Sequence, residues 1–178
     1  CTKNLPDMNI FNIADMRKSI KFKLYNEGIY SYEDLLNTDI KDKYKLQIKH
    51  ELYEMDDYID KDKIKEFLDT LSYPLYFLDF ETMAMPIPLY EGTHPFETIP
   101  FQYSLHYYED TNHKLEHKEF LAETGINPSR DLALRLVNDI PKDVCVLAYK
   151  MSVEKGVIKK LADAFPDLKD HLMNIHDN

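Results

Sequence analysis

The sequence has few cysteines and lacks long apolar runs. Its 178 residues include two cysteines, Cys1 and Cys145, too few for a disulfide framework or for a metal site built of cysteines. It contains no run of about 18 or more apolar residues and no signal-peptide core at its N-terminus. We therefore expect neither a membrane span nor a secretory signal, and we expect the protein to be cytoplasmic.

An excess of basic residues is also missing. The net charge is −10, whereas general nucleic-acid binders carry a basic surface. This charge still permits a metal-dependent nuclease, because such enzymes concentrate carboxylates in the active site and bound cations reverse the local field. The length permits one good core, or a compact domain with a smaller helical appendage, and the hydrophobic fraction of 44% is typical of an ordinary soluble protein.

Residues 1–71 are expected to form a helical N-terminal segment. Gly28 fits the position just after a helix, and Ser31 can cap the next helix. The resulting helix, Gly-Ile turn and helix are similar to a helix-hairpin-helix turn, which holds a nucleic-acid backbone on loop amides. The same pattern also joins helices in many small bundles, so both interpretations stay open. Further helices are expected over 44–53 and 62–71.

The stretch from Leu75 to Thr82 is apolar except for two acids near its end, and it predicts a strand that begins after Pro74. Side chains alternate along a strand, so Asp79 and Glu81 project to the same face, with Cα atoms about 6.5–7 Å apart. Two carboxylates this close favour a cation between them, and hard divalent cations prefer oxygen ligands. The pair predicts a Mg²⁺ or Mn²⁺ site. The alternative is that the two acids are only the polar start of a loop.

The rest of the chain predicts a mixed sheet with crossover helices. A proline-containing loop is expected over 83–99, followed by strands over 101–108 and 115–121, a helix over 127–140, a strand buried on both faces over 144–149 and a helix from Ser152. A right-handed crossover would place the first and fourth strands side by side and in parallel. Glu154, in the first turn after the fourth strand, is then expected near Asp79 and Glu81.

This order, with an acid-x-acid pair in the first strand and an acid after the fourth, resembles the ribonuclease-H-like fold of DEDD-type 3′–5′ exonucleases. Asp79-Phe80-Glu81-Thr82 is similar to the first motif of that group, and the segment from Tyr149 to Glu154 is similar to the second. More closely, residues 73–82 and 99–106 resemble a bacterial family of function-unknown proteins assigned to this fold. The resemblance covers nearly the whole chain.

The resemblance implies an α/β, ribonuclease-H-like domain over 72–178 that hydrolyses phosphodiesters at a single-stranded nucleic-acid end. It implies two divalent ions, Mg²⁺ or Mn²⁺, held by Asp79, Glu81 and Glu154, where one ion activates the attacking water and the other stabilises the leaving oxygen. The substrate contacts that it implies come from Thr82, Met83, Gln102 and Lys150. His94 and His106 are additional candidates because they lie near these motifs in the sequence.

The sequence also departs from the group. Lys150 stands where the second motif favours Asn, Val153 stands where it favours Phe, and no acid matches the last motif. We therefore expect an incomplete catalytic domain that belongs to a longer chain with upstream and downstream segments. Two other hypotheses remain: an inactive nucleic-acid-binding module, and a protein-interaction domain of a larger defence or repair protein. The choice between DNA and RNA stays open.

Overall fold

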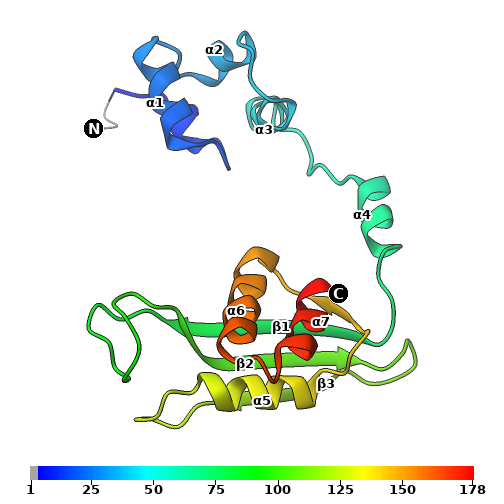
Figure 1. Cartoon of the computed structure of the whole chain (residues 1–178). Helices are drawn as coiled ribbons and strands as arrows, with labels where there is room; N and C mark the ends of the chain where they lie inside the picture. Colours follow the sequence, from blue (N-terminus) through cyan, green and yellow to red (C-terminus); the bar gives the residue numbers. More distant parts are fainter. Residues whose placement is uncertain (1–3) are drawn as a thin grey trace. The chain divides into compact units, whose positions relative to one another are not determined.

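The computed structural model describes residues 4–178, so Cys1 lies outside the described residues. The chain divides into two compact units, Cys1–Ile64 and Lys65–Asn178, which we call the helical unit and the α/β unit (Figure 1). The division falls within helix α4 (Lys61–Leu68), earlier in the chain than the boundary expected at residue 71.

The helical unit is built from short elements around a small apolar core. Its elements are η1 (Ile10–Asn12), α1 (Lys18–Asn26), α2 (Tyr32–Leu36) and α3 (Asp42–Leu52). Gly28 follows α1 with a φ of 81°, a conformation that glycine adopts without strain. The Ser31 hydroxyl accepts a hydrogen bond of 3.1 Å from the Asp34 amide and caps α2. The predicted turn and cap are therefore confirmed.

The α/β unit contains a four-stranded mixed sheet in the order β3-β2-β1-β4. Its elements are β1 (Leu75–Met83), β2 (Ile99–Tyr108), β3 (Glu116–Leu121), α5 (Ser129–Asp139), β4 (Cys145–Leu147), α6 (Met151–Ala164) and α7 (Lys169–Asp177). Strand β1 runs antiparallel to β2 and parallel to β4, and β2 runs antiparallel to β3. The predicted order of strands and helices and the α/β class are confirmed.

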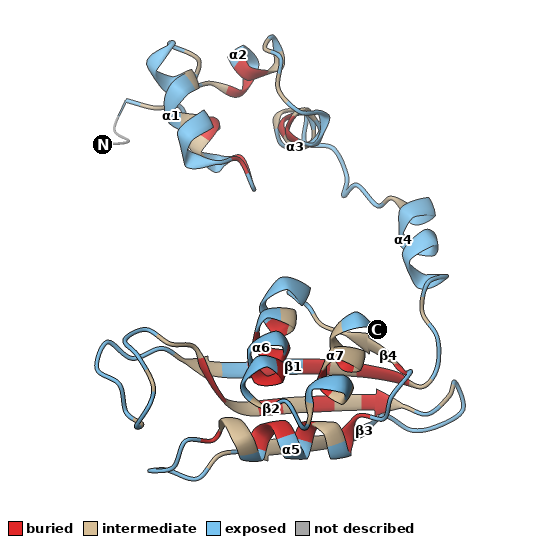
Figure 2. Ribbon diagram, in the orientation of Figure 1, coloured by how far each residue is buried: buried red, intermediate tan, exposed pale blue. Residues whose placement is uncertain are grey.

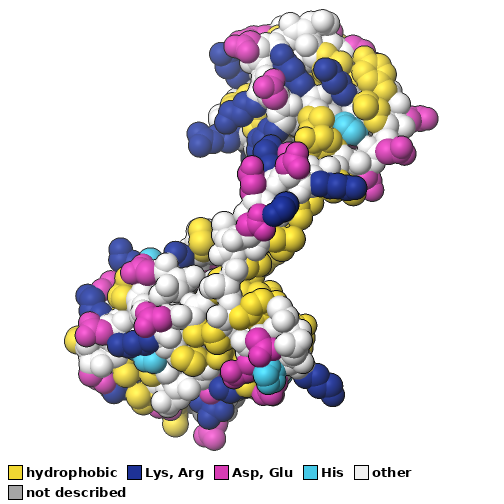
Figure 3. Space-filling model, turned by 90° about the vertical axis from the view of Figure 1, so that its right-hand side faces the viewer, with side chains coloured by type: hydrophobic (Ala, Val, Ile, Leu, Met, Phe, Trp, Pro, Cys, Tyr) yellow, Lys and Arg dark blue, Asp and Glu magenta, His cyan; other side chains and the backbone are white. Residues whose placement is uncertain are grey.

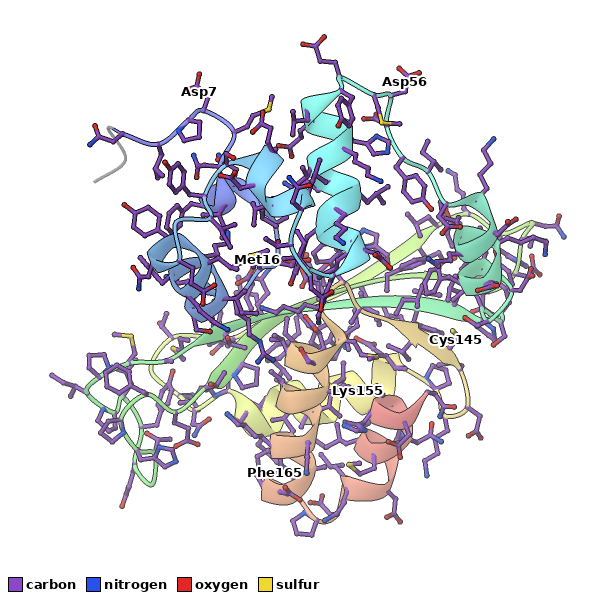
Figure 4. All side chains as sticks on the ribbon, turned by 90° about the horizontal axis from the view of Figure 1, so that it is seen from above. Asp7, Met16, Asp56, Cys145, Lys155 and Phe165 are labelled. Carbon is purple, nitrogen blue, oxygen red and sulfur yellow. The ribbon has the colours of Figure 1, made fainter. Side chains whose placement is uncertain are left out.

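The three helices α5, α6 and α7 all lie on one side of the sheet (Figure 4). The sheet residues that pack against them alternate along the strands, and Figure 2 shows the buried positions along β1 and β2 and on the helices. On the sheet the buried set is Tyr76, Leu78, Phe80, Tyr103, Leu105 and Tyr107, and on the helices it includes Leu132, Leu136, Val157, Ile158 and Leu161. Because side chains alternate, the odd-numbered residues of β1 up to Glu81 point to the other face.

Strand β4 differs from the strand that the sequence predicts. Only Cys145–Leu147 form it, paired with Leu75, Tyr76 and Phe77 of β1, and all three β4 residues are partly exposed. The expectation of a strand buried on both faces is wrong, because all three residues of β4 keep partial exposure although α5, α6 and α7 cover one face of the sheet. Cys145 is consequently a half-buried free cysteine.

A buried polar network links the sheet to α5. The Asp139 carboxylate, which is only 6% exposed, accepts hydrogen bonds from the Tyr103 hydroxyl at 2.7 Å and from the Arg135 Nε at 2.9 Å. Burial, together with the hydrogen bond to Asp139, raises the pKa of Tyr103 far above its ordinary value. The hydrogen bond between Tyr103 and Asp139 thus fastens α5 to β2.

Candidate functional site

The face of the sheet that α5, α6 and α7 leave uncovered carries most of the predicted site, and we call it the open face. Strand pairing places its side chains in three rows. The rows are Glu81 and Gln102 with Leu121, Asp79 and Ser104 with Glu119, and Phe77 and His106 with His117. Residues that face one another across neighbouring strands have Cβ atoms about 4.5–5.5 Å apart, so each row is a set of neighbours.

Asp79 and Glu81 are the two carboxylates of the central strand. Both are exposed, and both project from the open face as the sequence predicts. Within residues 4–178, neither carboxylate forms an ion pair or a hydrogen bond. Two neighbouring negative groups without a basic partner provide oxygen ligands for a hard divalent cation.

A hollow of about 840 Å³ lies over this part of the open face. Phe77, Asp79, Ser104, His106 and Tyr149 contribute to its lining. The Tyr149 side chain is fully exposed beside β4, and apolar side chains interrupt the charged surface of the α/β unit in Figure 3. The hollow therefore combines a carboxylate, polar groups and aromatic rings, a mixture that suits a polar ligand with a flat apolar part.

Glu154 lies on the other side of the sheet. It is 6% exposed, and it belongs to the stripe of α6 that also carries Val157, Ile158 and Leu161 of the core. It lines a hollow of about 300 Å³ that shares Phe67, Leu78, Leu147 and Ala148 with the larger hollow but includes neither Asp79 nor Ser104. Figure 4 shows α6, with Lys155 and Phe165 labelled, on the helix side of the strands.

The structure thus brings Asp79 and Glu81 together but does not bring Glu154 to them. No group of three or more His, Cys, Asp or Glu side chains in the described part of the chain is arranged to hold a metal ion. The three acids therefore do not converge on one cation as expected, because the rotation of α6 about its axis turns Glu154 towards the core. Position 154 is near the strand end along the chain, yet its side chain faces the helix side.

The expected substrate contacts fall at three places. Gln102 stands directly opposite Glu81 on the open face. Thr82 and Met83 follow a bulge that shifts the β1–β2 register after Glu81, and both are partly exposed. Lys150 is exposed immediately before α6. Bulges commonly redirect side chains next to functional sites, so the position of Thr82 is compatible with a substrate contact beside Asp79 and Glu81.

Two residues that the sequence alone did not single out lie in the same rows. Ser104 is opposite Asp79, and His117 is opposite His106 on β3. Alternation along β2 was the signal that could have placed Ser104 and His106 on the same face as Gln102. The pairing of His106 with His117 could not be predicted in this way, because it depends on the register between β2 and β3. His94 lies apart from this group, in the loop after β1, beside Glu97 at 3.6 Å.

Replacing Glu154 by methionine should stabilise the protein. The Glu154 Oε2 atom is buried without a hydrogen-bond partner among the described residues, and an unsatisfied buried polar atom costs free energy. We expect the free energy of unfolding, measured by urea denaturation, to rise by about 1–3 kcal/mol. Glu154→Gln, which keeps a polar group at the position, should gain less. A loss of stability in both variants would show that the carboxylate has a partner in solution.

None of the helices in the described part of the chain is long and apolar enough to cross a membrane. In comparisons with known proteins, neither a curated protein nor a solved structure matches the chain significantly. The sequence profile of one family does match, over residues 76–178, which include the whole sheet except its first residue and all of α5, α6 and α7. The match covers more than half of the 178 residues. The chain therefore belongs to the family described as domain of unknown function DUF2779.

Proposed function

We propose that the α/β unit is a metal-dependent 3′–5′ exonuclease-like domain that hydrolyses nucleic-acid phosphodiesters. The observation that carries this proposal is the exposed, unpaired carboxylate pair Asp79 and Glu81 on the open face of the central strand. The strand order with β1 parallel to β4 is compatible with the ribonuclease-H-like fold that the motifs resemble. We assign the domain to that fold as part of the same proposal.

The donor set of this pair fits one hard cation. Carboxylate oxygens are the ligands that Mg²⁺ and Mn²⁺ prefer, and the exposed positions of Asp79 and Glu81 leave room for water and for substrate oxygens. The described residues do not fit the two-ion site implied by the resemblance, because Glu154 is turned to the helix side. A bound divalent cation would supply charge neutralisation at a phosphate and a more acidic water.

The other proposed contacts with nucleic acid come from Gln102 and Phe77 of the open face and from Tyr149 and Lys150, which lie between β4 and α6. Gln102, opposite Glu81, can donate its amide hydrogens to a phosphate or sugar oxygen. The aromatic rings of Phe77 and Tyr149 at the hollow can stack on unpaired bases, whose flat faces are accessible at a single-stranded end. Lys150 can contact a phosphate from the start of α6. Single-stranded ends of DNA or RNA are therefore the proposed substrates.

A second candidate is a binding module of the same fold without turnover. It is favoured by the separation of Glu154 from Asp79 and Glu81, since a lone carboxylate pair offers fewer ligands than the two-ion mechanism uses. Such a module would serve a larger defence or repair protein by holding nucleic acid or another protein. It would bind single strands, or a partner, and leave them intact.

Metal binding tests the proposal directly. In the full-length protein, Mn²⁺ should raise the melting temperature of the wild type by several degrees, because a ligand of the native state stabilises it. Asp79→Asn should remove this shift, while Glu109→Gln, on the loop after β2, should keep it. In parallel, oligonucleotides labelled at the 5′ or 3′ end should be shortened from the 3′ end. If the wild type binds Mn²⁺ and both labelled oligonucleotides stay whole, the binding module replaces the exonuclease.

A further inference from the structure

We propose that His106 and His117 form a second metal site on the open face, one that takes a borderline transition-metal ion such as Zn²⁺. The site differs from the carboxylate pair in its chemistry, because imidazole nitrogen binds Zn²⁺, Ni²⁺ and Cu²⁺ in preference to Mg²⁺. It does not depend on the proposed nuclease activity.

The two imidazoles are held as direct cross-strand neighbours. His106 of β2 pairs with His117 of β3 in the antiparallel register, and their rings are stacked with centroids 4.3 Å apart and an interplanar angle of 28°. The backbone fixes the two Cβ atoms at about 4.5–5.5 Å. Rotation about the side-chain torsions can then bring one nitrogen of each ring to a distance of about 2.0–2.1 Å from a shared ion, which is the usual Zn–N bond length.

Ser104 orients one of the rings. The Nε2 atom of His117 lies 3.0 Å from the Ser104 hydroxyl oxygen. In the tautomer in which Nε2 donates its proton to Ser104, the Nδ1 atom of His117 keeps its lone pair for a metal ion. Metal-binding histidines commonly donate their second nitrogen to a neighbouring oxygen in this way, which fixes the tautomer and the ring orientation.

No carboxylate competes for these rings. Within residues 4–178, neither His106 nor His117 forms an ion pair, whereas His113 pairs with Asp110 at 2.9 Å and His176 pairs with Asp177 at 2.6 Å. A histidine held by a carboxylate gains a charge partner for its protonated form, and the stacked pair has none. Apart from the contact of His117 Nε2 with Ser104, the ring nitrogens of this pair are therefore open to a metal ion.

The site has two protein ligands and open coordination positions. No third His, Cys, Asp or Glu completes a metal-binding group in the described part of the chain. Water or an oxygen of a bound molecule would fill the remaining positions, as in zinc sites that keep an open position. We therefore expect an exchangeable ion that is accessible from the hollow above His106.

A thermal titration with ZnCl₂ tests the site. At a free Zn²⁺ concentration about ten times the dissociation constant, the melting temperature of the full chain should rise by about 5 °C. The double variant His106→Asn/His117→Asn should lose this rise, and Ser104→Ala should weaken Zn²⁺ binding by about 10-fold. His113→Ala is the matched control, because it removes an exposed histidine outside the open face, and it should behave as the wild type.

Two further measurements distinguish the histidine site from the carboxylate pair. The first uses the wild type, so its result does not depend on how a variant folds. In the wild type, the ring signals of His106 and His117 should be the first histidine signals in the NMR spectrum to respond to Zn²⁺. The variant Asp79→Asn/Glu81→Gln should keep the Zn²⁺ effect while losing the Mn²⁺ effect. If Zn²⁺ stabilises the histidine double variant fully, or if the carboxylate double variant loses the Zn²⁺ effect, the proposed histidine site is overturned.

Discussion

Replacing Glu81 by glutamine should lower the rate of 3′-end cleavage on the order of 100-fold. The substitution keeps the size of the side chain but removes one of the two negative oxygen donors of the proposed cation site. A group that stabilises the reacting charge is commonly worth such a factor. The measurement is single-turnover cleavage of a 5′-labelled oligonucleotide by the full-length protein at saturating Mn²⁺.

Glu119 supplies the matched control for this experiment. It lies on β3 in the row of Ser104, so it is an exposed glutamate of the same open face, but it is separated from Glu81 by strand β2. Glu119→Gln changes the net charge equally and should leave cleavage unchanged. If both variants lost the same amount of cleavage activity, the net charge of the open face would be what matters, and Glu81 would have no specific role.

Replacing Leu136 by alanine should reduce the free energy of unfolding by about 3 kcal/mol. Leu136 is fully buried between α5 and the sheet, so the substitution removes buried apolar surface and leaves a cavity. Urea denaturation followed by circular dichroism measures the change. A loss of this size is a large part of the stability of a small domain.

Leu134 of the same helix is the control. It is 36% exposed, and its replacement by alanine should cost less than about 1 kcal/mol. Both substitutions have the same helix propensity change, so their difference isolates burial. If the two variants lost equal stability, α5 would not pack on the sheet through the face that carries Leu136.

Local patterns predicted most of the fold because each element carries its own signal. The apolar run that ends in Asp79 and Glu81 gave β1, and the spacing of Leu132, Leu136 and Ile140 gave α5. The element order followed from these, as did the parallel pairing of β1 with β4. The length of β4 was overestimated, because the apolar composition of 144–149 does not show where the chain leaves its pairing with β1.

The placement of the candidate site residues was predictable only in part, for reasons that also follow from geometry. Alternation along one strand fixes the common face of Asp79 and Glu81, which needs no tertiary information. The side that Glu154 faces depends on the rotation of α6, and its spacing of three, four and seven residues from Val157, Ile158 and Leu161 was the available signal that it belongs to the buried stripe. The pairing of His106 with His117 depends on the length of the turn between β2 and β3, which composition does not fix.

The limited extent of β4 has a mechanical consequence for the central strand. Leu75, Tyr76 and Phe77 are bonded to a neighbour on each side, but from Leu78 onward the described β1 has β2 as its only sheet neighbour. Detaching the Met83 end of β1 from the sheet therefore breaks hydrogen bonds to β2 alone, whereas detaching its Leu75 end breaks bonds to both β2 and β4, so local fluctuations are expected at the Met83 end. The two carboxylates are thus carried on the half of β1 that has a single sheet neighbour, while Leu78 and Phe80 beside them anchor this half in the core.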